Sequence, residues 1–92
     1  IDPGFGFGKS MEHNYTLVSQ LEKIVAIGQP VMVGFSRKSM IYKLLKTTPD
    51  EALNGTTVLN AVALMKGVSV LRVHDAREAI ETVKIIEQIK KA

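Results

Sequence analysis

Cysteine and tryptophan are both absent from the 92 residues of this sequence. Without cysteine, a disulfide framework, a thiol nucleophile and a thiolate metal site are excluded. No apolar run approaches the roughly 20 residues that a membrane-spanning helix needs, and no signal peptide opens the chain. We therefore predict a cytoplasmic protein that does not contact a membrane. The chain begins with Ile1-Asp2-Pro3-Gly4, which we interpret as the start of a piece of a longer protein.

Aromatic residues are scarce as well, at 5% of the chain. The net charge is +3, but the lysines and arginines are scattered along the sequence. Proteins that bind nucleic acid usually present stacking aromatics or a basic stripe. We therefore predict no nucleic-acid partner. The apolar fraction of 46% is high enough for a buried core.

What the sequence does contain is an alternation of strand and helix patterns. Residues 31–35 and 68–73 are short apolar runs, typical of strands buried on both faces. Helical spacing covers residues 14–27, residues from 36 onward, and the segments after 48, 56 and 75. This order predicts parallel strands joined by helices, in an α/β fold. An open doubly wound sheet and a part of a (β/α)8 barrel fit the pattern equally well.

The same spacing predicts where the helices are capped and which of their faces are buried. Gly28, Gly55 and Gly67 are expected to end helices, and Thr48-Pro49-Asp50-Glu51 has the form of a capping box. We expect Thr56 or Thr57 to cap the next helix and Asp75 to cap the last one. The predicted inward-facing residues are Leu17, Leu21, Ile24, Val25, Met40, Ile41, Leu44, Leu45, Val58, Leu59, Val62, Ala63, Met65, Ile80, Val83 and Ile86.

The charged and polar residues that could bind a ligand fall at the predicted strand ends. In both candidate architectures, ligands bind where parallel strands end and loops begin. Asp2 follows the first strand, Ser36-Arg37-Lys38-Ser39 follows the second, and Arg72 and His74 close the third. Three strand ends in register therefore predict one binding rim.

The first of these loops is rich in glycine. It reads Asp2-Pro3-Gly4-Phe5-Gly6-Phe7-Gly8-Lys9-Ser10, and alternate glycines let a flat ligand approach the backbone closely. A P-loop is excluded because Pro3 stands where that motif needs its first glycine. The dinucleotide pattern fails because Lys9 takes the third glycine position. A purely structural turn is the alternative interpretation.

The cations of the second and third strand ends suit an anion. Two cations in the first turn of a helix oppose its macrodipole, unless a bound anion offsets them. We assign Lys38 and Ser39 to function but expect Arg37, taken alone, to be an exposed basic turn. Arg72 and His74 lie two apart on a strand, so their side chains project to the same side and suit a diphosphate. No metal-ligand pattern is found, since the two histidines belong to different units.

Together these motifs resemble the dihydropteroate synthase family. The similar segments are residues 1–9 followed by His13-Asn14, residues 34–41, and Arg72-Val73-His74-Asp75 with Glu78. The resemblance covers the whole chain. It implies that residues 1–92 are the C-terminal part of a (β/α)8 TIM barrel, about its last three β/α units with parallel strands.

The resemblance also implies roles for the rim residues. Asp2 would bind the amino-pyrimidine edge of a pterin, and Lys38 its carbonyl oxygen or ring nitrogen. Phe7 would lie near the p-aminobenzoate ring, Ser39 would hold its carboxylate, and Gly6 would also bind substrate. Arg72 and His74 would bind the diphosphate. The residues implied to be catalytic are Lys38, Arg72 and His74.

The implied activity is that of a transferase in folate biosynthesis. It joins 6-hydroxymethyl-7,8-dihydropterin diphosphate to p-aminobenzoate and releases pyrophosphate. Sulfonamides would compete, and Mg2+ would accompany the diphosphate, with its ligand outside these residues. The full-length protein would be a homodimer, and the 92 residues alone would be inactive. Alternatives are another pterin-binding barrel, such as a methyltetrahydrofolate-handling domain, and a non-catalytic oligomerising fragment.

Overall fold

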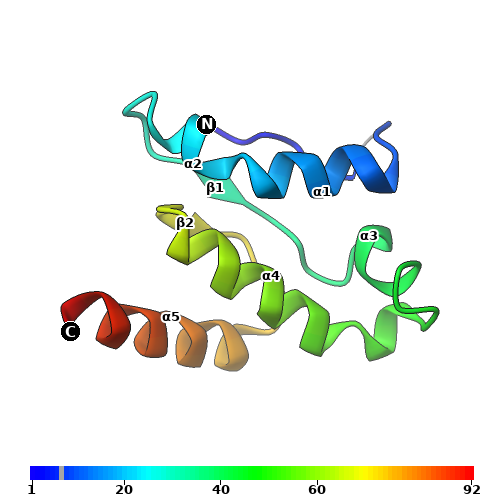
Figure 1. The fold of residues 1–92 in the computed structure, drawn as a ribbon. Coiled ribbons are helices and arrows are strands. Elements are labelled where there is room, and N and C mark those ends of the chain that lie inside the picture. The colour runs from blue at the N-terminus through cyan, green and yellow to red at the C-terminus, as the bar shows by residue number, and fades with distance from the viewer. Residues whose placement is uncertain (7) are drawn as a thin grey trace.

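A computed structural model describes residues 1–6 and 8–92 of the chain. Figure 1 shows the order of its elements along the chain. These are α1 (Met11–Ser19), α2 (Leu21–Val25), β1 (Met32–Val33), α3 (Ser39–Tyr42), the 3-10 turn η1 (Pro49–Glu51), α4 (Leu53–Met65), β2 (Val70–Leu71) and α5 (Ala76–Lys91). Within this described part, no helix is long and apolar enough to cross a membrane.

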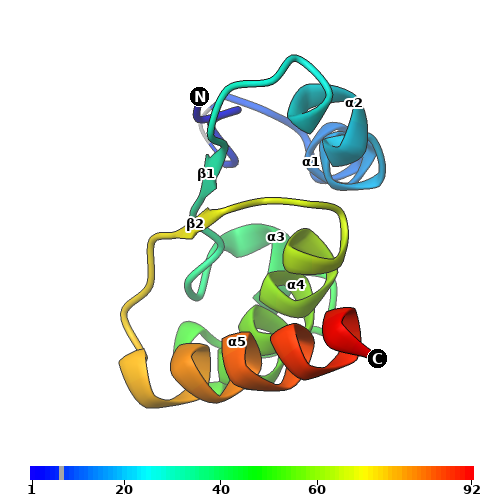
Figure 2. The same ribbon diagram turned by 90° about the vertical axis from the view of Figure 1, so that its left-hand side faces the viewer.

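The strands are parallel, as predicted. Strand β1 pairs with β2, with Met32 opposite Val70 and Val33 opposite Leu71. Ile1 lies along the other side of β1, because the Met32 amide donates to the Ile1 carbonyl at 2.7 Å. In Figure 2, α1, α2 and α4 all lie to one side of these strands. Regular pairing is shorter than the predicted runs of 31–35 and 68–73, although Val31, Val33 and Phe35 are fully buried.

The core lies between the strands and the helices. Its largest fully buried side chains are Phe35, Leu21, Met40, Ile41, Val31 and Val33. Phe5, from the glycine loop, belongs to the same core, and its ring centroid lies 4.6 Å from that of Phe35. The glycine loop is therefore anchored by a buried aromatic pair.

The helix predicted over residues 14–27 is two helices. It starts earlier, at Met11, because the Ser10 hydroxyl accepts the His13 amide at 3.1 Å and caps α1. It breaks at Gln20, and α2 follows. Helix α2 ends at Val25, earlier than the predicted stop at Gly28, which lies in the turn after the helix with a φ of 96° that favours glycine.

The prediction that Gly55 ends a helix is wrong. Helix α4 runs through Gly55, so neither Thr56 nor Thr57 caps it, and the capping-box segment forms only the turn η1. The Thr56 hydroxyl instead donates to the Ala52 carbonyl one turn earlier. A Cβ at position 55 would collide with Cγ2 of Ile41, so glycine here allows α3 and α4 to pack closely.

Several predicted inward faces are also wrong. Met40, Ile41, Leu59, Ala63 and Ile86 are buried as expected, but Leu44, Leu45, Val58, Met65 and Ile80 are each more than 50% exposed. Helix α3 is a single turn, so Leu44 and Leu45 lie beyond it. Helix α5 turns Ala79, Thr82 and Ile86 inward, which leaves Ile80 at the edge of its buried stripe.

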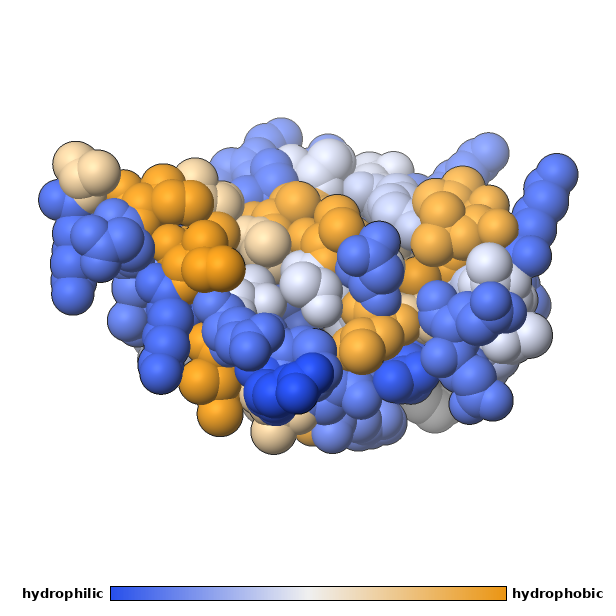
Figure 3. Space-filling view, turned by 90° about the horizontal axis from the view of Figure 1, so that it is seen from below, coloured by the Kyte–Doolittle hydropathy of each residue, from blue (hydrophilic) through white to orange (hydrophobic). Residues whose placement is uncertain are grey.

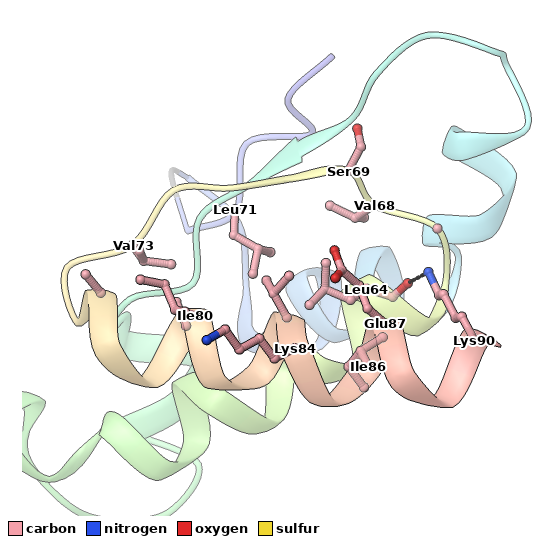
Figure 4. A pocket seen from close by; sticks show the side chains of 14 residues that line it. Leu64, Val68, Ser69, Leu71, Val73, Ile80, Lys84, Ile86, Glu87 and Lys90 are labelled. Atoms are coloured by element: carbon pink, nitrogen blue, oxygen red, sulfur yellow. Dashed lines mark hydrogen bonds between the residues drawn. The ribbon is translucent and has the colours of Figure 1, made fainter. Parts of the chain in front are cut away.

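An apolar groove lies between β2 and α5 (Figure 4). Leu71 and Val73 line it from the strand side, and Ile80, Val83 and Ile86 from the helix. On the face seen in Figure 3, apolar patches alternate with hydrophilic side chains. Val70 of β2 is 44% exposed, so the edge of the described sheet presents apolar surface.

We predict that Gly55→Ala destabilises the fold even though alanine is the better helix former. Overpacking against Ile41 is expected to cost about 1–3 kcal/mol, which exceeds the gain of about 1 kcal/mol in helix propensity. Urea denaturation followed by circular dichroism measures the difference. Asn54→Ala, at the exposed neighbouring position, is the control and should not destabilise. A Gly55→Ala variant as stable as the parent would contradict the close packing.

Candidate functional site

A hollow of about 620 Å3 opens at the ends of the parallel strands. Three segments that are distant in sequence form it: the glycine loop, the start of α3 and the end of β2. Its lining residues are Asp2, Gly4, Phe5, Gly6, Gly8, Lys38, Ser39 and Arg72. The strand ends therefore meet at one rim, as the sequence pattern predicts.

Side chains hold the glycine loop in its shape. The Gly4 amide donates to Asp2 Oδ1 at 2.8 Å, and Lys9 Nζ donates to the Gly4 carbonyl at 2.7 Å. The Gly6 amide donates to Asn14 Oδ1 at 2.9 Å. Asn14 is only 3% exposed, so this bond ties the loop to the buried side of α1.

Lys38 is held against the loop backbone. Its Nζ donates to the Phe5 carbonyl at 2.8 Å, and its stem lies over Gly6, whose φ is 100°. Partial burial lowers the pKa of Lys38, and the Arg72 and Lys9 charges act in the same direction. The Asp2 carboxylate opposes this shift. Lys38 is thus a partly desolvated donor that faces one carboxylate and two cations.

Arg72 lies over Gly34, the glycine that follows β1. A Cβ at Gly34 would come within 3.2 Å of Arg72 Nε, so glycine at 34 leaves room for the guanidinium. Arg72 Nη2 lies 3.9 Å from Asp2 Oδ2, and its side chain is 63% exposed. The guanidinium is therefore held loosely and remains open to a ligand.

Two predicted residues stand apart from this hollow. His74 is exposed and does not line it, and its backbone amide donates to Ser36 Oγ at 3.0 Å. Phe7 lies outside the described residues. Asp2, Gly6, Lys38, Ser39 and Arg72 do gather at the rim, and their roles toward a ligand stay predictions.

The interpretation of Arg37 as an exposed basic turn is wrong. Its Nε and Nη2 each donate to Asp75 carboxylate oxygens at 3.1 Å, and Nη1 donates to the carbonyls of Pro49 and Asp50. Asp75 precedes α5 as predicted, but its carboxylate makes no cap bond to the described helix. The bidentate bond from Arg37 lowers the pKa of Asp75. Sequence periodicity could not detect this pair, because its members are 38 residues apart.

The residues from 36 to 38 also precede the helix instead of opening it. Helix α3 covers only Ser39–Tyr42, and Lys38 is its extended N-cap residue. A single turn has a small macrodipole, so the argument from helix charge carries little weight here. The case for anion binding depends instead on the positions of Lys38 and Arg72, which both line the hollow.

Sequence reasoning misses two residues that shape the site. Asn14 enters it only as part of a motif, yet it fixes the Gly6 amide. Gly34 enters it only as a strand residue and as the first residue of the 34–41 segment, yet it makes space for Arg72. A glycine inside an apolar strand signals the close approach of another group, and that signal could have found Gly34.

Among the described residues, no group of three or more histidine or acidic side chains could hold a metal ion. The described lining of the hollow offers a single carboxylate, Asp2, and that is already bonded to the Gly4 amide. Mg2+ prefers a near-octahedral shell of oxygens. The residues described here do not make a magnesium site by themselves.

Comparison with known proteins identifies the family. The family described as "Pterin binding enzyme" matches residues 1–74. This chain belongs to the pterin-binding enzymes. Dihydropteroate synthase of Escherichia coli strain K12 is 44% identical over 87 residues, which cover 95% of this chain and 31% of that protein.

Solved structures agree with this placement. The crystal structure of Yersinia pestis dihydropteroate synthase superposes with a TM-score of 0.95 at 41% identity, over 99% of this chain and 37% of that one. The Thermus thermophilus enzyme, solved in complex with 6HMPPP, gives 0.91 at 46% identity, over 97% and 36%. The resemblance to dihydropteroate synthases is confirmed, and the fold is an α/β unit with parallel strands that matches part of their barrel. This chain spans about a third of the length of the curated relatives it matches.

We predict that Asn14→Ala destabilises the protein by about 1–3 kcal/mol, because the Gly6 amide loses its acceptor in a partly buried place. Urea denaturation measures the change in the free energy of unfolding. His13→Ala, at the exposed neighbouring position on α1, is the matched control and should change stability little. Equal midpoints for the two variants would show that the Gly6 amide does not depend on Asn14.

Proposed function

We propose that these residues form part of the active site of a dihydropteroate synthase, a transferase of folate biosynthesis. The observation that carries the proposal is the meeting of Asp2, Lys38 and Arg72 at one hollow. Structures of the Thermus thermophilus enzyme with 6HMPPP and with 4-aminobenzoate, and of the Yersinia pestis enzyme with a sulfonamide drug, support it. The corresponding partners here are a dihydropterin diphosphate, p-aminobenzoate and competing sulfonamides.

We place the chain, residues 1–92, as the C-terminal portion of a (β/α)8 barrel domain, about its last three β/α units. The parallel pairing of Ile1, β1 and β2 supports this, as does the apolar groove beyond β2. The full-length protein is proposed to be a cytoplasmic homodimer. Mg2+ would neutralise charge on the diphosphate, with ligands from outside these residues.

The polar groups of the hollow suit a pterin. The free oxygen of the Asp2 carboxylate accepts hydrogen bonds from the amino-pyrimidine edge, which presents a planar array of donors. Lys38 Nζ donates to the pterin carbonyl oxygen or ring nitrogen. Since Nζ already donates to the Phe5 carbonyl, the ligand shares a donor that is held in place before it binds.

The cations suit the departing diphosphate. The aryl amine of p-aminobenzoate attacks the methylene carbon of the pterin, the carbon–oxygen bond breaks with its electron pair leaving on the diphosphate, and the amine loses its proton to solvent. Negative charge grows on the leaving oxygen, and Arg72 at the hollow stabilises that charge. We assign the same role to His74, two residues further along, although its side chain does not line the described hollow. Because this charge is larger in the transition state than in the substrate, the cations accelerate the step.

The p-aminobenzoate side of the site is the less complete one. We assign Ser39 to its carboxylate and Gly6 and Phe7 to its ring. Ser39 lines the hollow next to Lys38, and Gly6 exposes its backbone there. The amine would then lie between the glycine loop and the pterin methylene.

We predict that Lys38→Met and Arg72→Ala each lower kcat/KM for dihydropteroate formation by roughly 10²–10³-fold in a full-length protein that carries this chain. Each removes a donor aimed at the hollow, and a coupled assay of pyrophosphate release measures the loss. Lys66→Ala removes a cation that binds Glu22 and the Ser19 carbonyl and does not line the hollow, and should leave the rate unchanged. Full activity in both site variants would refute the assignment.

We also predict that the 92 residues alone form no measurable dihydropteroate. Half a pocket lacks the preorganisation that orients two substrates. The same pyrophosphate assay on the purified chain tests this, and product formation would overturn it.

A further inference from the structure

Two loops of the site are joined by Arg37 and its neighbours, although Arg37 itself does not line the hollow. We call this set the Arg37 network: Arg37, its partner Asp75, the Thr56 hydroxyl, and the carbonyls of Pro49 and Asp50. Beside it, the His74 amide donates to Ser36 Oγ. Residues 36–37 of the β1–α3 loop are thereby fastened to residues 74–75 of the β2–α5 loop.

The network holds a backbone conformation that arginine does not favour. Arg37 has a φ of 52°, in the left-handed region, which costs an L-residue about 1–2 kcal/mol. Its amide donates to Thr56 Oγ1 at 3.0 Å, and its guanidinium makes four further hydrogen bonds. A planar guanidinium can serve such a divergent set of acceptors, and an ammonium cannot.

The backbone conformation of Arg37 determines the direction in which the chain continues at Lys38. Lys38 follows directly as the extended N-cap residue of α3, and its side chain reaches back to the Phe5 carbonyl. If Arg37 relaxed to an ordinary conformation, the chain direction at Lys38 would change. Lys38 Nζ would then leave its place beside Arg72 and Asp2.

The ion pair with Asp75 also gives Arg37 a different role from Lys38 and Arg72. Arg37 carries its charge next to Lys38 in sequence, but that charge is neutralised by a bidentate carboxylate away from the hollow. Lys38 and Arg72 are left to face the ligand. Repulsion between the Arg37 and Lys38 charges inside the loop is thereby reduced.

We propose that Arg37 is a positioning residue that acts through Lys38: the Arg37 network fixes the 36–38 backbone so that Lys38 Nζ is aimed into the hollow. The effect on catalysis rests on the proposed function above. The effect on the placement of Lys38 does not, and can be measured without substrate.

The experiment compares Arg37→Ala, Arg37→Lys and Asp75→Asn in a full-length protein that carries this chain. Glu22→Gln is the matched control, because it weakens a comparable ion pair, with Lys66, outside the site. We expect kcat/KM to fall roughly 10- to 100-fold in Arg37→Ala and Asp75→Asn, the scale of loss when a catalytic group is misplaced by about 1 Å. Arg37→Lys keeps the charge but loses the planar fork, and should fall between these and the parent.

The second readout is the titration of Lys38, followed by NMR in protein with isotope-labelled lysine. Lys38 faces Arg72, Lys9 and Asp2, and burial keeps its pKa below the usual lysine value. Release of the loop into solvent should raise that pKa toward the usual value in Arg37→Ala and Asp75→Asn, but not in Glu22→Gln. A purely structural role for Arg37 would lower thermal stability without moving the Lys38 titration.

The outcomes separate this inference from the proposed function. If the parent protein makes no dihydropteroate but Lys38 titrates higher in the Arg37 variants, the function fails and the positioning role stands. If the parent is active and the Asp75→Asn and Arg37→Lys variants keep both its kcat/KM and its Lys38 titration, the positioning role is overturned. Should Arg37→Ala not fold, these two milder variants decide the result.

Discussion

The hydrogen bond from Lys38 Nζ to the Phe5 carbonyl connects the buried core, to which Phe5 belongs, to the hollow that Lys38 lines. Phe5 is buried against Phe35, so the carbonyl that receives the bond cannot move far. A partly desolvated ammonium is costly unless it donates to fixed acceptors. The packing of this aromatic pair therefore anchors the glycine loop at Phe5 and, through the Phe5 carbonyl, holds Lys38 at the hollow.

The rest of the rim depends on space as much as on charge. Gly34 leaves room for the Arg72 guanidinium, and Gly55 lets α3 approach α4, which places the residues before α3 at the mouth of the hollow. Neither glycine lines the hollow itself. The absence of a side chain at Gly34 and Gly55 thus leaves space in which Arg72 and the residues before α3 can approach the hollow.

The alternation of strand and helix and the gathering of Asp2, Lys38 and Arg72 could be predicted, because both depend on local pattern and on the rule that parallel strands end together. Helix boundaries near Gly55 and Gln20 could not, since tertiary packing overrides a glycine signal and interrupts a continuous helical pattern. Arg37 is misjudged for the same reason. Its partners come from the start of α5 and from η1, which local reasoning treats as separate capping problems.

The cations that the structure describes near the rim show why residue type alone does not define a role. Lys9 is bonded to the Gly4 carbonyl, Arg37 to Asp75, and Lys38 to the Phe5 carbonyl, whereas the partner described for the Arg72 guanidinium is the more distant Asp2 carboxylate. A growing negative charge attracts all of them, but only a cation that can leave its present partner, or share it, can respond. Arg37 cannot do so without losing its bonds to Asp75, which hold the β1–α3 and β2–α5 loops together. Lys38 can share its bond and Arg72 is loosely held, so these two are able to turn toward a ligand: in the proposed reaction, Lys38 toward the pterin and Arg72 toward the leaving diphosphate.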